Sequence, residues 1–265
     1  MTQYSSAAHC AANHNVSSAG LPVYCDPGNC PSVHEADTEI INPFWDLQPG
    51  DVAGYLAVDR TNNLIVLSFR GTVSNENKLT DLEFQQVDAS SLCSGCYAHR
   101  GFWEASSSAF KILNPALKAV MTKYPNFDLI VTGHSLGGAL ATLQAVLLKA
   151  DGHQLDMYTF GAPSVGNRML AEFITSQGLG KNYRLTHTDD EVPKVLYQAS
   201  RAVLLDIIVP EYSQSSPEYW ITSPNGISVT TSDIQVIHGV DNTAGNLGQP
   251  GFDMSAHDWY MINTT

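Results

Sequence analysis

The middle of the chain places a strand, a glycine-rich turn and an apolar helix in direct succession. The strand is the short apolar run Leu129–Thr132, the turn is Gly133-His134-Ser135-Leu136-Gly137, and the helix is Ala139–Lys149. A turn this sharp forces Ser135 into a strained backbone conformation and pushes its hydroxyl out over the edge of the sheet. The flanking glycines are then required, because side chains at their positions would clash with the neighbouring strand and helix. An ordinary glycine-rich turn between a strand and a helix is the alternative interpretation.

Runs with strand and helix character alternate on both sides of this turn. Val52–Val58 and Leu64–Phe69 flank the polar segment 59–63 and predict a hairpin. The other expected elements are a helix over Phe102–Tyr124 that Pro115 kinks or divides and Pro125 ends, a strand over Met157–Phe160, a helix over Asn167–Ser176 and a strand over Tyr183–Thr186. This alternation predicts an α/β fold in which a central, mostly parallel sheet is flanked by helices. No interdomain linker is apparent, so we expect one domain over residues 1–265; beyond Pro193 the pattern becomes irregular.

Composition excludes several classes of partner. The 265 residues carry 13 basic and 26 acidic side chains, a formal net charge of −13. Nucleic-acid binding is not expected, because proteins that bind phosphate backbones gather cations on one face. Charge also disfavours adsorption to anionic membranes, so any contact with lipid must be apolar. There is no run of eighteen apolar residues, and the first residues lack a signal-peptide stretch, which predicts a mature chain behind an added initiator Met.

Four of the five cysteines bracket short turns. Cys25 and Cys30 flank Asp26-Pro27-Gly28-Asn29, and Cys93 and Cys96 enclose two residues. Such loops are typical of local disulfides in an oxidising compartment. The Cys93–Cys96 spacing also suits half of a zinc site or a redox pair, but His99 lacks the companions that a full zinc set needs. The glycosylation triplets Asn15-Val16-Ser17 and Asn263-Thr264-Thr265 likewise fit a secreted protein.

Ser135 needs a base and an orienting acid if it is to act as a nucleophile, because a serine hydroxyl is weakly nucleophilic at neutral pH. In α/β hydrolases the acid and then the histidine follow the serine along the chain. The expected strand Tyr183–Thr186 runs into an acidic loop, in which Asp189, Asp190 and Glu191 are equal candidates by spacing. For the base, His257 and His238 compete. Each of these residues taken singly is more commonly a solvated loop residue.

Two backbone positions are candidates for stabilising an oxyanion. The amide of Leu136 begins the helix after Ser135, and the segment Phe69-Arg70-Gly71-Thr72 ends an early strand. The amide and hydroxyl of Thr72 could both point at developing negative charge. A plain β-turn is the alternative for this segment.

With these residues assembled, the chain resembles the filamentous-fungal (class 3) lipases of the α/β-hydrolase superfamily over nearly its whole length. The stretches that carry the resemblance are Tyr4-Ser5-Ser6-Ala7-Ala8, Leu67-Ser68-Phe69-Arg70-Gly71-Thr72, Cys93-Ser94-Gly95-Cys96, Val131–Thr142, Phe160–Asn167, Thr186–Pro193 and Ser216–Ile221. The resemblance implies Ser135, Asp190 and His257 as the catalytic triad and Thr72 and Leu136 as the oxyanion hole, with Asp81 positioning the Thr72 hydroxyl. It also implies disulfides Cys25–Cys30 and Cys93–Cys96.

The resemblance further implies a short hinged lid at roughly Val73–Leu82. The residues assigned to it are Val73, Ser74, Asn75, Glu76, Asn77, Lys78, Leu79, Thr80 and Leu82. This lid is polar, with Lys78 where better-known members carry Trp, which argues against strong interfacial activation. Two other features depart from the family: an apolar insert, Val203–Val209, lies within residues 194–211 close to the predicted triad acid, and Gln214 stands where relatives often have His.

The sequence therefore predicts a secreted serine lipase that hydrolyses tri-, di- or monoacylglycerols through an acyl-enzyme. Its expected partners are an ester substrate and the lipid–water interface, with no nucleic acid, no obligate protein partner, no cofactor and no metal. No Gly-x-Gly-x-x-Gly follows the first strand, so a dinucleotide site is not indicated. The alternatives are a feruloyl-type or short-chain carboxylesterase and a catalytically impaired lipid-binding or interaction protein.

Overall fold

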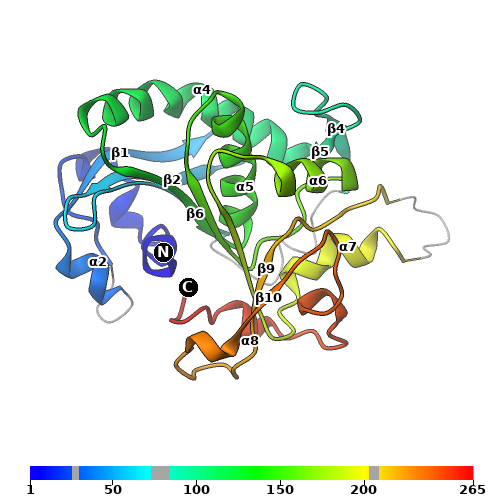
Figure 1. Cartoon of the computed structure of the whole chain (residues 1–265). Coiled ribbons are helices and arrows are strands. Elements are labelled where there is room, and N and C mark those ends of the chain that lie inside the picture. Colours follow the sequence, from blue (N-terminus) through cyan, green and yellow to red (C-terminus); the bar gives the residue numbers. More distant parts are fainter. Residues whose placement is uncertain (26–29, 73–83, 203–208, 265) are drawn as a thin grey trace.

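A computed structural model of the chain describes residues 1–25, 30–72, 84–202 and 209–264. Its centre is an eight-stranded sheet in the order β1-β2-β3-β6-β7-β8-β9-β10 (Figure 1). The strands are β1 Thr38–Leu47, β2 Val52–Asp59, β3 Leu64–Phe69, β6 Asp128–His134, β7 Asp156–Phe160, β8 Asn182–His187, β9 Glu218–Ile221 and β10 Ile234–Ile237. The strands from β3 to β9 pair in parallel, whereas β1–β2, β2–β3 and β9–β10 pair antiparallel. A separate two-stranded sheet pairs β4 Gln86–Asp88 with β5 Tyr97–His99. The predicted α/β fold with a mostly parallel sheet is confirmed.

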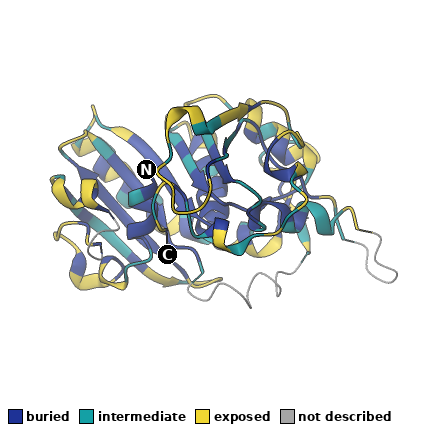
Figure 2. Cartoon of the chain, turned by 90° about the horizontal axis from the view of Figure 1, so that it is seen from below, coloured by how far each residue is buried: buried dark blue, intermediate teal, exposed yellow. Residues whose placement is uncertain are grey.

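Helices cover both faces of the large sheet. The α-helices are α1 Thr2–Ala7, α2 Pro31–Glu35, α4 Arg100–Lys123, α5 Leu136–Ala150, α6 Arg168–Ser176, α7 Val195–Ala199 and α8 Met254–His257. Alternate residues of β2 show the two layers: Leu56 and Val58 pack in the core with α4 and α5, whereas Tyr55 and Ala57 pack with α1. All eight residues of β2 are buried, as expected of an interior strand covered on both sides. Figure 2 shows that buried residues fill the middle of the molecule and exposed residues lie at its surface. Across the described residues, none of the helices combines the length and apolarity that crossing a membrane requires.

Helix α1 is fastened to the sheet by polar contacts as well as by packing. The Tyr4 hydroxyl donates to the carboxylate of Asp59 at the end of β2. The carbonyl oxygen of Tyr4 in turn accepts hydrogen bonds from the hydroxyls of Tyr55 at 2.7 Å and Ser68 at 3.0 Å. Because these side chains belong to adjacent strands, the buried polar groups of α1 and the sheet satisfy one another.

Most elements expected from periodicity are present with slightly different ends. The hairpin of β2 and β3 forms around residues 59–63 as predicted. The predicted helix over Phe102–Tyr124 is one helix, α4, that continues through Pro115 and ends before Pro125. The pattern missed β1, because Pro43 and two register shifts interrupt its alternation.

The two short cysteine loops are closed by disulfides. Cys25 pairs with Cys30 and Cys93 pairs with Cys96, with Cα–Cα distances of 5.9 and 5.4 Å. Both predicted pairings are therefore confirmed. The Cys93–Cys96 bond also leaves that pair without the thiolates that a zinc site would use.

Candidate active site

Ser135 occupies the predicted turn between β6 and α5. Its backbone has φ 56° and ψ −128°, a conformation that non-glycine residues adopt only when the surroundings enforce it. A Cβ added to Gly133 would lie 2.2 Å from the carbonyl oxygen of Gly137, and one added to Gly137 would lie 2.3 Å from that of Phe69. The two glycines therefore allow β6, α5 and β3 to approach closely, and the predicted strand–turn–helix arrangement is present.

Asp190 and His257 form a fully buried pair close to this turn. His257 Nδ1 lies 3.0 and 3.1 Å from the two carboxylate oxygens of Asp190, and neither side chain is exposed to solvent. The bond to Asp190 is made by the Nδ1 proton, which leaves His257 Nε2 as the basic nitrogen. Nε2 is buried and has no hydrogen-bond partner among the described residues. This is the arrangement required of a base that a carboxylate orients.

The backbone brings this pair next to the serine turn. The Ser135 amide donates to the carbonyl oxygen of Phe160 at 2.9 Å. The next residue, Gly161, has φ +59°, and a Cβ there would lie 2.9 Å from both Asp190 Oδ2 and His257 Cε1. A side chain at position 161 would therefore displace the acid or the base, which explains a requirement for glycine that spacing alone does not reveal.

Two further donors hold the Asp190 carboxylate. The Tyr260 hydroxyl donates to Oδ2, and the Val192 amide donates to Oδ1 at 2.9 Å. Burial, followed by the charge of Asp190, raises the pKa of Tyr260 well above its usual value, so this phenol keeps its proton. Sequence reasoning did not identify Tyr260 as a partner of the acid, although it lies three residues after His257.

The competing acid and histidine candidates lie elsewhere. Asp189 and Glu191 are partly exposed, and the Asp189 carbonyl oxygen accepts from the Asp253 amide at 3.3 Å. His238 is exposed, and its carbonyl oxygen accepts from the side-chain amide of Asn242. The geometry thus favours the pair that the family resemblance implies over the alternatives that spacing left open.

The two expected oxyanion donors belong to adjacent segments. Leu136 is the first residue of α5, so its amide is one of the unpaired donors at the helix N-terminus. Thr72 follows β3, and the residue before it, Gly71, is so close to the serine turn that a Cβ there would lie 2.8 Å from the carbonyl oxygen of His134. Asp81 and the expected lid residues, Val73–Thr80 and Leu82, lie outside the described residues.

Comparisons with known proteins show the family of the chain. The family model for lipase (class 3) matches residues 66–200. The secreted mono- and diacylglycerol lipase A of Penicillium cyclopium is 40% identical, and the match covers 98% of this chain and 82% of that protein. The chain belongs to the class 3 lipase family. The secreted mono- and diacylglycerol lipase 1 of Fusarium solani is 38% identical over 98% of this chain and 73% of its own. The crystal structure of the mono- and diacylglycerol lipase from Aspergillus oryzae superposes with a TM-score of 0.85 at 38% identity, covering 99% of this chain and 94% of the other.

Lys194 joins the two segments of this lipase that carry the acid and the histidine. Its side chain is fully buried, and Nζ donates to the carbonyl oxygens of Gly251 and, at 3.4 Å, Gln249. Burial lowers the pKa of Lys194, whereas the acidic loop at 189–191 opposes that shift. Because residues 249–251 lead directly into α8 and His257, the lysine holds the histidine segment against the acidic loop. In the sequence, Lys194 could have been identified as a single basic residue close to the acidic residues 189–191.

Three imidazole rings form a row that ends at His257, in which His134 and His257 are buried and His9 is partly exposed. The ring centroids of His9 and His134 are 5.9 Å apart, and those of His134 and His257 are 4.4 Å apart. Burial lowers the pKa of His9 to about 4, and the charges of Arg70, His14 and His257 lower it further. Burial likewise lowers the pKa of His134 well below its usual value, and its Nε2 donates to the carbonyl oxygen of His257 at 2.8 Å. Both rings are therefore neutral at neutral pH.

Among residues 1–25, 30–72, 84–202 and 209–264, no group of three or more His, Cys, Asp or Glu side chains is arranged to hold a metal ion. The apolar insert Val203–Val209 lies mostly outside the described residues. In the described part that precedes it, Arg201 lies over the Tyr197 ring at 3.6 Å and donates to the Tyr212 carbonyl oxygen at 2.8 Å.

Replacing Lys194 by Met should lower kcat by about 10- to 100-fold with little change in KM, because small misplacements of a catalytic group are costly. Lys194→Arg keeps the charge and should restore most of the rate. The matched control is Lys149→Met, which removes another ammonium bound to a backbone carbonyl, that of Gly180 at 3.4 Å, away from the acidic loop. Steady-state kinetics of the three variants check this, and an equal loss of kcat in Lys149→Met would contradict it.

Acidification should destabilise the fold partly through His9. Its native pKa of about 4 lies below the ordinary value of 6.5, so the unfolded chain binds an extra proton between these pH values. His9 therefore does not change the free energy of unfolding above about pH 6.5, and it lowers that free energy as the pH drops toward 4. When the pH is lowered from 7.5 to 4.5, the free energy of unfolding of His9→Gln should rise by about 1–2 kcal/mol relative to that of wild type. This energy is reduced to allow for the partial exposure of the ring. Urea unfolding at both pH values measures this, and the control is His238→Gln, which replaces an exposed histidine. If the difference in free energy of unfolding between His9→Gln and wild type is the same at both pH values, His9 is not responsible.

Proposed function

We propose that this class 3 lipase is a secreted serine hydrolase that cleaves the carboxylic-ester bonds of acylglycerols and prefers mono- and diacylglycerols. The observation that carries the proposal is the buried Asp190–His257 pair, with a free Nε2, beside the strained turn of Ser135. The substrate preference and the secretion rest on the relatives in Penicillium and Fusarium, which are secreted mono- and diacylglycerol lipases.

In the proposed mechanism Ser135 Oγ attacks the ester carbonyl carbon while His257 Nε2 takes its proton. His257 then gives that proton to the departing glycerol oxygen, and an acyl-enzyme forms on Ser135. Water, activated by the same nitrogen, hydrolyses the acyl-enzyme and releases the fatty acid. Asp190 keeps the Nδ1 proton in place throughout and stabilises the charged imidazolium.

Thr72 and Leu136 are the proposed oxyanion donors. The unpaired amide at the start of α5 and the positive end of the helix dipole both favour negative charge at this position. Thr72 adds an amide and a hydroxyl from the end of β3, and Asp81 is proposed to orient that hydroxyl. Removing one such donor typically costs about 10²–10³ in kcat.

The lipid–water interface is the proposed site of action. A net charge of −13 disfavours electrostatic attraction to anionic lipid, so the proposed contact with the interface is made by apolar surface. In the predicted lid the large apolar residues are Leu79 and Leu82, which favours a small rate increase when substrate exceeds its solubility limit.

A substrate panel tests the proposal. Monoolein, diolein, triolein, tributyrin and methyl ferulate are compared by fatty- or phenolic-acid release, with purified Ser135→Ala as the blank. We expect the highest kcat/KM on monoolein and diolein, and a loss on the order of 10⁶ in kcat for Ser135→Ala. Preference for methyl ferulate would instead indicate a feruloyl-type esterase. Folded wild-type protein without hydrolysis of any ester would indicate a lipid-binding or interaction protein.

A further inference from the structure

The segment after α1 carries a glycosylation triplet that the hydrolytic site does not use. Asn15-Val16-Ser17 has a hydroxyl residue at the third position and a residue other than proline at the second. All three residues are exposed. Asn15 Oδ1 accepts a hydrogen bond from the Ser17 amide at 3.1 Å, whereas Nδ2 makes no hydrogen bond within the described part of the chain. The nitrogen that would carry a sugar is therefore available.

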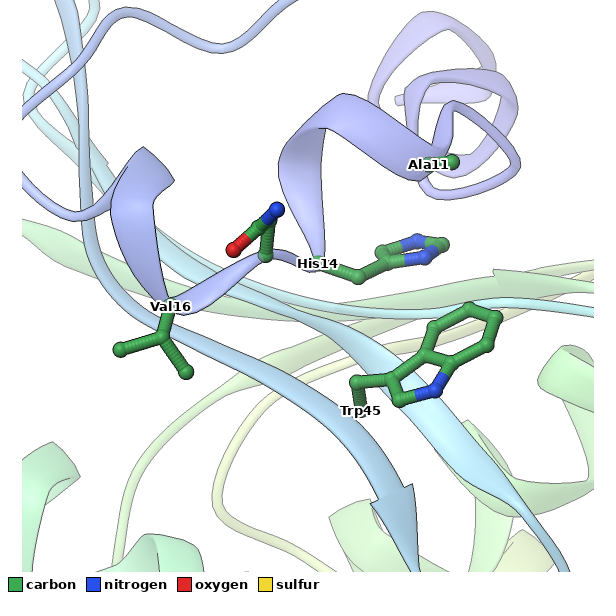
Figure 3. Close-up of a pocket in the computed structure, with 5 residues that line it drawn as sticks. Ala11, His14, Val16 and Trp45 are labelled. Atoms are coloured by element: carbon green, nitrogen blue, oxygen red, sulfur yellow. The ribbon is translucent and has the colours of Figure 1, made fainter.

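A hollow of about 360 Å³ lies directly beside this asparagine. It is lined by Ala11, His14, Asn15, Val16 and Trp45. Figure 3 shows the His14 and Trp45 rings next to one another on one side of the hollow and Val16 on the other. Its volume is at the small end of the range for ligand pockets, roughly 300–1,000 Å³, so it suits one ring rather than an extended chain.

The ring that forms the wall of the hollow is held in place yet remains exposed. His14 stacks on Trp45 with a centroid distance of 5.4 Å and an interplanar angle of 24°, and the Arg70 guanidinium lies 4.5 Å from the Trp45 ring centroid. Trp45 nevertheless keeps 51% of its surface exposed, and Val16 keeps 85%. An immobilised aromatic ring and an aliphatic side chain thus expose apolar surface to water on both sides of Asn15, which an adjacent apolar group would cover favourably.

We propose that Asn15 is N-glycosylated and that the first N-acetylglucosamine lies in this hollow against Trp45. The C–H groups of the sugar ring are the apolar groups that would cover the indole, while its hydroxyls and acetamide stay in water. The inference rests on the proposed secretion, because the sugar donor, a polyisoprenyl-diphosphate oligosaccharide, belongs to the secretory pathway. In the transfer the Asn15 Nδ2–C1 bond forms and Nδ2 loses one proton. The bond from C1 to the diphosphate oxygen breaks, and the diphosphate leaves with its electron pair.

The second triplet lies in a different setting. Thr264 is buried, and its hydroxyl donates to the Asp258 carbonyl oxygen at 3.1 Å. The Asn263 carbonyl oxygen accepts from the Ser6 hydroxyl, which ties this segment to α1. Neither of the two described hollows is lined by Asn263. Asn263 is exposed as well, but of these two hollows the one lined by Trp45 lies beside Asn15.

Occupancy is tested by secreting the chain from a yeast host and analysing glycopeptides by mass spectrometry after endoglycosidase trimming to one N-acetylglucosamine. Wild type and Ser17→Thr should carry the sugar at Asn15, and Ser17→Ala should not. Secreted wild type without sugar at Asn15 would overturn the inference. Diolein hydrolysis by the same preparations reports separately on the proposed function, because an inactive but glycosylated protein would contradict only the latter.

The position of the sugar is tested on the trimmed wild type against Asn15→Gln. The sugar should lower hydroxyl-radical oxidation of Trp45 at least twofold and raise Tm by about 2–4 °C, and the Tm difference should vanish in a Trp45→Ala background. Equal oxidation together with a Tm difference that persists in Trp45→Ala would show that the sugar lies outside the hollow. Protection of Trp45 by diolein emulsion and not by the sugar would overturn the proposal and assign the ring to the lipid surface.

Discussion

The contact between Asp190 and His257 is the interaction on which the geometry of the site depends. Two groups that form an ion pair when the imidazole is protonated are buried together, and burial of charge is costly unless each group has a partner. The carboxylate is therefore surrounded by donors from His257, Tyr260 and the Val192 amide. Once this pair is fixed, Gly161 must lack a side chain, and the segment before His257 must be held against the acidic loop, which Lys194 does.

The close approach of backbone segments is the second constraint on the geometry of the site. Gly133, Gly137 and Gly161 each lie where a Cβ would come within 3 Å of another group. The first two let the strand and the helix meet at Ser135, and the third leaves room for the acid and the base. These contacts, and the hydrogen bond that the Ser135 amide donates to the Phe160 carbonyl oxygen, maintain the positive φ of Ser135. The strained serine is therefore a property of the packed sheet rather than of the turn alone.

Local patterns made the serine turn and several central strands predictable, because β2, β3 and β6 are largely apolar and glycines lie on both sides of Ser135. Strands β7 and β8 are mixed in polarity and were expected from the alternation of strand-like and helix-like segments. Strands β9 and β10 are only four residues long, which is too short for periodicity to distinguish them from the irregular segment after Pro193. Spacing could not choose among Asp189, Asp190 and Glu191, since adjacent residues of a loop point in directions that only tertiary packing decides. Tyr260 and Lys194 could not be assigned either, because their roles arise from contacts across 70 and 57 residues of sequence.

The account is tested most directly by comparing two adjacent substitutions of the same kind. Asp190→Asn leaves the site nearly isosteric but removes the charge that keeps the proton on His257 Nδ1, and we expect kcat to fall by about 10⁴. Asp189→Asn, one residue away and partly exposed, should leave kcat within about threefold of wild type. Measured on diolein with both proteins folded, a larger loss in Asp189→Asn, or equal losses in the two, would contradict the assignment of Asp190 as the residue that holds His257.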